Sequence, residues 1–73
     1  MNDWQERMVQ EYNELKDRYQ KLHRIIVRDE ARTLDFEPVS PRYLLKEQAE
    51  AMGKYLYCLE VRAELEGVKL DTH

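Results

Sequence analysis

Residues 8–26, MVQEYNELKDRYQKLHRII, decide the fold of this chain. Apolar side chains recur along this stretch at alternating spacings of four and three residues. That alternation places them on one face of a helix, in the pattern by which two helices pack along a common seam. The seam residues are Met8, Tyr12, Leu15, Tyr19, Leu22 and Ile26. The stretch therefore predicts a long helix over about residues 3–28.

A second periodic stretch follows a short break that contains both prolines of the chain. Ser40 is expected to cap the helix there, with Pro41 in the first position and Val39 packed against Leu44. Gly67 suits the left-handed residue that follows a last helical turn. A second helix is thus predicted over about residues 41–66. Its seam residues show the same alternation and are Leu45, Ala49, Met52, Leu56, Leu59 and Ala63.

Two helices of equal length that are joined by a short break predict an all-α fold, an antiparallel two-helix hairpin. The chain has 73 residues, so we interpret residues 1–73 as one domain with a linker over about 29–40 and a tail over 67–73. Leu34 and Phe36 in the linker are expected to fold back over the end of the hairpin.

The second helix carries a further apolar row, which one partner helix leaves uncovered. A chain this short has a thin core, and its single cysteine excludes an internal disulfide. Contiguous apolar surface usually marks an interaction site, and most soluble oligomers are symmetric. We therefore predict a homo-oligomer, a dimer or a larger helical bundle. The predicted interface, here called the outer row, is formed by Leu44, Ala51, Tyr55, Cys58 and Leu65.

Composition and motifs argue against several classes of function. The net charge is −3 with 37% charged residues, which does not suit general nucleic-acid binding. The longest apolar run, residues 55–59, is far shorter than the ~20 residues that span a bilayer. No catalytic motif, phosphate loop or zinc-ligand spacing occurs, so we expect no enzyme, no metal and no cofactor. An unbridged cysteine fits a reducing cytoplasm.

Basic side chains gather at positions that the hairpin brings to its linker end. The second helix adds its unpaired N–H groups and the positive end of its dipole there. We call the following five residues the basic pole: Arg24, Arg28, Arg32, Arg42 and Lys46. The pole is a candidate site for a small ligand that carries phosphate. The predicted ligand contacts are Arg24, Arg28, Arg42 and Lys46, with Tyr43 available to stack on a base.

A structural interpretation of the same residues stays open. Arginines near the end of a helix complement its dipole. Arg42 falls at a seam position and can pair with Asp29, closing the hairpin, while the acidic linker neutralises the other basic residues.

Two stretches resemble a known group of proteins. The first is WQERM at residues 4–8 with EYNELKDR at 11–18, and the second is LLKEQAEAM at 44–52 with YLYCLEVR at 55–62. Both are similar to short helical accessory proteins of crAss-like and related bacteriophages. The resemblance implies a phage-encoded protein that acts in the cytoplasm of the bacterial host.

Small accessory proteins that are not enzymes generally act by stoichiometric binding. The leading hypothesis is a counter-defence protein that sequesters a cyclic-nucleotide-type immune signal in basic pockets of a homo-oligomer. One alternative is a protein–protein inhibitor of a host defence enzyme or polymerase. Another is a structural or assembly protein without a ligand.

Overall fold

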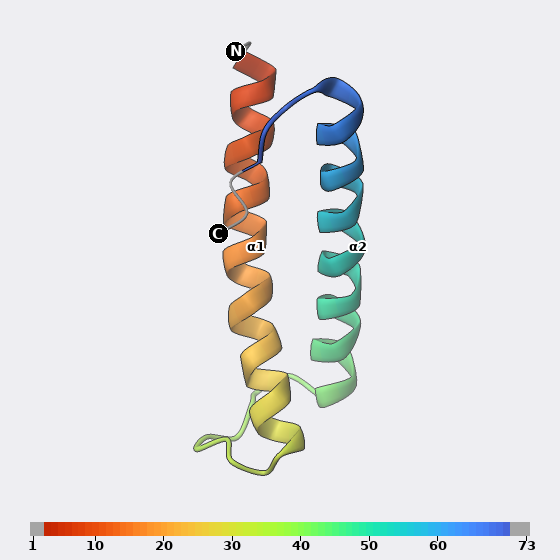
Figure 1. Ribbon diagram of the computed structural model, residues 1–73. Coiled ribbons are helices and arrows are strands. Elements are labelled where there is room, and N and C mark those ends of the chain that lie inside the picture. The colour runs from red at the N-terminus through yellow and green to blue at the C-terminus, as the bar shows by residue number, and fades with distance from the viewer. Residues whose placement is uncertain (1–2, 71–73) are drawn as a thin grey trace.

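The structure is a computed structural model that describes residues 3–70. Two helices, α1 (Asp3–Glu30) and α2 (Arg42–Glu66), lie side by side and run in opposite directions (Figure 1). The described residues contain no strand. The molecule is elongated, with extents of 44 × 19 × 18 Å. The predicted all-α hairpin is confirmed, although α1 runs on to residue 30 and α2 begins at residue 42.

The predicted seam residues meet between the two helices. The buried ones are Met8, Tyr12 and Leu15 of α1 with Leu56, Leu59 and Ala63 of α2. The partly exposed ones lie nearer the linker and are Tyr19, Leu22, Ile26, Leu45, Ala49 and Met52. The core therefore sits in the half of the hairpin away from the linker. In the half near the linker, the seam residues of both helices stay partly exposed to solvent.

A hydrogen bond crosses the seam at the edge of this core. The hydroxyl of Tyr12 donates to Oε2 of Glu60 on α2 at 2.8 Å. Burial, followed by the hydrogen bond to Glu60 and its negative charge, raises the pKa of Tyr12 from 10.0 to about 12. A buried phenol needs such a partner, so this contact fixes how α1 and α2 face each other.

The end of α2 follows the sequence prediction. Gly67 has a φ of 68°, in the left-handed region, and its N–H donates to the carbonyl of Ala63. The N–H of Val68 donates to the same carbonyl at 2.8 Å. This ending turns the chain back toward α1, as Figure 1 shows. Val68 is consequently buried and joins the core, although it lies in the predicted tail outside both helices.

The start of α2 differs from the sequence prediction. The residue before the helix is Pro41, whose backbone is extended, and no side chain caps the helix. Since the helix begins only after Pro41, Ser40 lies one residue too far away to reach the free N–H groups. Val39 is fully exposed, so it does not pack against Leu44. The predictions of a Ser40 cap and of a Val39–Leu44 contact are therefore wrong.

Candidate functional site

The end of α1 sets the shape of the linker, residues 31–41. Arg32 has a φ of 61°, a left-handed conformation that a residue with a Cβ adopts at a cost. The N–H of Arg32 donates to the carbonyl of Asp29 at 3.1 Å, and the N–H of Thr33 donates to that of Arg28 at 2.9 Å. These two bonds form the same kind of helix ending that glycine usually makes. Arg32 is thereby held at the hairpin end.

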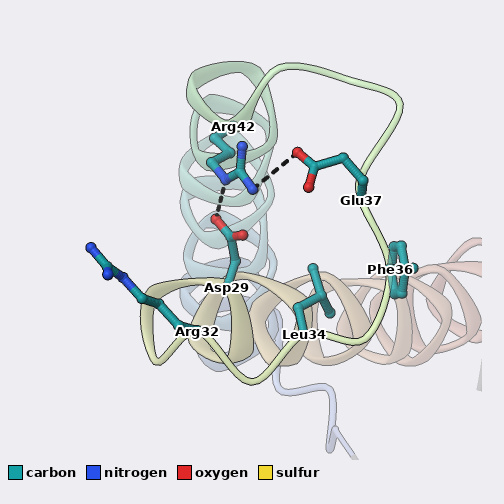
Figure 2. Close-up of a pocket in the computed structure, with 6 residues that line it drawn as sticks. All are labelled: Asp29, Arg32, Leu34, Phe36, Glu37 and Arg42. Atoms are coloured by element: carbon teal, nitrogen blue, oxygen red, sulfur yellow. Dashed lines mark hydrogen bonds and ion pairs between the residues drawn. The ribbon is translucent and has the colours of Figure 1, made fainter.

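Arg42 joins the two helices and the linker at this end. Its Nε donates to Oδ2 of Asp29, on α1, at 2.7 Å. Its Nη2 lies 3.2 Å from Oε1 of Glu37, in the linker. Figure 2 shows the guanidinium between the two carboxylates. The hydrogen bond to Asp29, together with the charges of Asp29 and Glu37, raises the pKa of Arg42. The Arg42–Asp29 pair that the structural interpretation expected is therefore formed.

Lys46 makes a second ion pair between the helices. Its Nζ lies 2.7 Å from Oε1 of Glu30, the last residue of α1. This contact with Glu30 raises the pKa of the Lys46 ammonium. Two of the five residues of the basic pole are thus neutralised by carboxylates within the hairpin itself. The neutralising groups come from the end of α1 and from the linker, as the structural interpretation anticipated.

The remaining basic residues of the pole keep their charges uncompensated. Across residues 3–70, the side chains of Arg24, Arg28 and Arg32 form no ion pair. Arg24 and Arg28 are each two residues from Ile26, so they lie about 160° around α1 from this seam residue. They therefore face away from α2. A single hairpin brings Arg32, but not Arg24 or Arg28, beside Arg42.

A hollow of about 430 Å³ opens at the linker end, and we call it the linker hollow. It is lined by Asp29, Arg32, Leu34, Phe36, Glu37 and Arg42. Leu34 is partly buried, whereas Phe36 leaves about half of its side chain exposed, so Leu34 folds back and Phe36 stays open to solvent. Figure 2 shows the side chain of Arg32 directed away from Arg42, at the edge of the hollow.

The linker hollow contains residues that were not predicted from the sequence to be ligand contacts. Phe36, Glu37 and Arg32 come from a linker that has no helical period to predict which way its side chains face. The one feature of the sequence that could have indicated this hollow is the mixture of acidic, basic and aromatic residues around the prolines. Among the predicted contacts, Tyr43 is exposed but does not line the hollow, and neither does Lys46.

The outer row of α2 lies on the surface of the hairpin. All five of its residues are exposed, including 46% of Tyr55 and 81% of Leu65. Cys58 is a free, exposed thiol in the middle of the row. On other sides of the same helix Tyr43, Tyr57 and Val61 are exposed as well. Apolar surface thus surrounds α2, which one hairpin covers only along the seam.

Two classes of site are not found in the part of the chain that the structure describes. Residues 3–70 contain no group of three or more His, Cys, Asp or Glu side chains placed to hold a metal ion. Neither of the two helices is long and apolar enough to span a bilayer.

Fold and site together define a small all-α hairpin protein with a polar hollow, containing arginines and carboxylates, at its linker end. The chain belongs to the Sequestin family, whose model matches residues 2–65. No curated protein and no solved structure matches the chain.

Proposed function

We propose that this chain is a phage counter-defence protein that sequesters a cyclic-nucleotide-type immune signal by stoichiometric binding. Membership of the Sequestin family is consistent with a sequestering function. The resemblance to phage accessory proteins supports a role against host immunity in the bacterial cytoplasm.

The observation that carries the proposal is the chemistry of the linker hollow. Arg32 offers a guanidinium group that forms no ion pair within residues 3–70, and Arg42 offers the terminal nitrogens that Asp29 does not contact. Guanidinium groups bind phosphate through two parallel hydrogen bonds. Phe36 offers an open aromatic face, on which a base can stack. Asp29 offers its second carboxylate oxygen, Oδ1, which can accept a hydrogen bond from the amino group of a base. A nucleotide carries all three complementary groups, whereas inorganic phosphate carries one of them.

The proposed binding unit is a homo-oligomer. A compact monomer of 8.9 kDa exposes about 4,800 Å² by the usual scaling of surface with mass. This chain exposes 5,876 Å², an excess of about 1,000 Å². One partner of a standard interface buries about 800 Å², so a second copy seated on the outer row would cover an area of similar size to this excess. In such an assembly Arg24, Arg28, Tyr43 and Lys46 complete the pocket from neighbouring copies.

Calorimetry with a panel of cyclic dinucleotides and cyclic trinucleotides tests the proposal. The chain is expected to bind one class at micromolar concentration or tighter, and Phe36→Ala is expected to weaken that binding by tenfold or more. Val39→Ala is the matched control, because Val39 is an exposed apolar residue of the same linker that does not line the hollow. Flat titrations across the panel would remove the proposal.

A second candidate function is inhibition of a host defence enzyme or polymerase through protein contact. The exposed outer row favours it, because tyrosine and other apolar residues are enriched in the centres of interfaces. In that case one host protein copurifies with the chain, and replacing Tyr55 and Tyr57 abolishes the copurification while Arg42→Ala does not. The opposite pattern would favour the linker hollow.

A further inference from the structure

The two carboxylates that hold Arg42 are differently placed. Asp29 lies in the last turn of α1, only 19% of its side chain is exposed, and it accepts from Nε at 2.7 Å. Glu37 lies in the linker, 80% of its side chain is exposed, and its oxygen lies 3.2 Å from Nη2. The Asp29 carboxylate is therefore held by helix α1, whereas the Glu37 carboxylate is a solvent-exposed contact of the Arg42 guanidinium.

The linker around Glu37 has little to hold it in this position. Phe36 and Val39 on either side of it are exposed, and among the linker residues described Leu34 and Pro38 alone are partly buried. An exposed ion pair of this kind changes an equilibrium by at most about fivefold, because water and dissolved ions compete with it. Glu37 can therefore leave Arg42 without disturbing the helices.

A bound phosphate needs the edge of Arg42 that Glu37 occupies. Arginine binds phosphate through two neighbouring N–H groups, and Asp29 already accepts from Nε, which leaves the end-on edge formed by the two terminal nitrogens. The remaining donors are those of the terminal nitrogens, and Glu37 lies against one of them, Nη2. The carboxylate and the ligand anion therefore compete for the same part of the guanidinium.

From this arrangement we infer that Glu37 is a built-in competitor for the ligand, and that Asp29 is the positioning residue that aims Arg42 into the linker hollow. Binding exchanges the Glu37 carboxylate for a ligand phosphate. An anion that cannot displace Glu37, such as a simple monocarboxylate, is excluded. The inference rests on the proposed function, because it assigns roles within the same hollow.

Calorimetry on the full chain and on Glu37→Gln tests the inference, with cyclic di-AMP and inorganic pyrophosphate as probes. Glu37→Gln is expected to bind a probe about two- to fivefold more tightly than the unmodified chain. Glu47→Gln is the matched control, since Glu47 is an exposed glutamate near the start of α2 that makes no ion pair within residues 3–70. Glu47→Gln removes the same charge as Glu37→Gln, and its affinity for the probe is expected to stay within about 1.5-fold of that of the unmodified chain. Circular dichroism verifies that both variants keep their helices.

The possible outcomes separate the inference from the function on which it rests. Equal tightening by Glu37→Gln and Glu47→Gln would reduce the effect to net charge and overturn the inference. Unchanged or weaker binding by Glu37→Gln would also overturn it, while leaving sequestration intact. If neither the chain nor any variant binds either probe, and the wider nucleotide panel is flat as well, the proposed function falls and the inference falls with it.

Discussion

Replacing Tyr12 by phenylalanine tests the contact that fixes the two helices against each other. The change removes the hydroxyl that donates to Glu60 at 2.8 Å and leaves the buried ring in place. A hydrogen bond to a charged acceptor contributes about 1.5–3 kcal/mol, and water replaces part of that at the exposed Glu60. We therefore expect Tyr12→Phe to lower the free energy of unfolding by about 1–1.5 kcal/mol at pH 8. For a chain of this size that is roughly 4–12 °C in Tm.

The effect of this substitution is expected to change sign with pH. The pKa of Tyr12 is raised to about 12, so the folded state favours the neutral phenol. The neutral Tyr12 hydroxyl contributes its full stabilisation of the fold below pH 10, which is the pKa of the tyrosine in the unfolded chain. This stabilisation is lost as the pH rises through about 12, the pKa in the folded chain. Between these two pKa values the unmodified chain loses about 1.4 kcal/mol of stability for each pH unit. At pH 11 this loss equals the about 1–1.5 kcal/mol by which the hydrogen bond stabilises the chain at pH 8. The phenylalanine variant has no such group to ionise.

Urea denaturation of both proteins from pH 8 to pH 11.5 measures the difference. Protein concentration and ionic strength are held constant, because self-association would shift the apparent stability. We expect the unmodified chain to be more stable at pH 8, the two to be equal near pH 11, and the variant to be more stable above that. The other tyrosines and lysines cancel in the comparison. A stability difference that stays constant over the whole range would refute the assignment of the Tyr12–Glu60 hydrogen bond.

Further substitutions test the backbone and the core by urea unfolding. Gly53→Ala is expected to stabilise the hairpin by up to about 1 kcal/mol, because a Cβ there meets the Tyr19 ring at an ordinary 3.6 Å; a loss of stability would contradict this. Gly67→Ala is expected to cost about 1 kcal/mol, because φ is 68° at that residue, and a neutral result would argue against the left-handed ending. Arg32→Gly is expected to raise the free energy of unfolding by about 1 kcal/mol, because glycine adopts the left-handed φ of 61° without strain; a lower stability would contradict a left-handed Arg32. Leu59→Ala, at the most buried position, is expected to cost about 2–5 kcal/mol; a cost below 1 kcal/mol would place the core elsewhere.

The sequence predicted the parts of the fold that depend on period and on special residues. The alternating spacing from Met8 to Ile26 identified the seam, because only one face of a helix can meet a partner. Gly67 identified the end of α2, because its missing Cβ suits a left-handed residue. The same logic missed the end of α1, where Arg32 takes the left-handed conformation without being glycine. A short-range pattern does not reveal that the surrounding turn supports such a residue.

The candidate site was less accessible to sequence reasoning. The pairing of Arg42 with Asp29 was foreseen as an alternative, because both fall on the seam near the linker. The contacts of Glu37 and the open face of Phe36 were not foreseen, because the linker has no period and its prolines permit several paths. The sequence also placed Arg24 and Arg28 at the right end of the hairpin but not on the right side of α1.

Native mass spectrometry of the purified chain, incubated with the nucleotide panel at micromolar concentration, shows whether the chain sequesters a nucleotide as an oligomer. We expect a species at two or more times the 8.9 kDa chain mass, carrying a phosphate-containing adduct in a fixed ratio to the number of chains. Tyr55→Glu in the outer row is expected to reduce that mass, and Phe36→Ala to remove the adduct while leaving the mass of the assembly unchanged. A folded species at the mass of one chain, with no adduct from any member of the panel, would contradict sequestration by an oligomer.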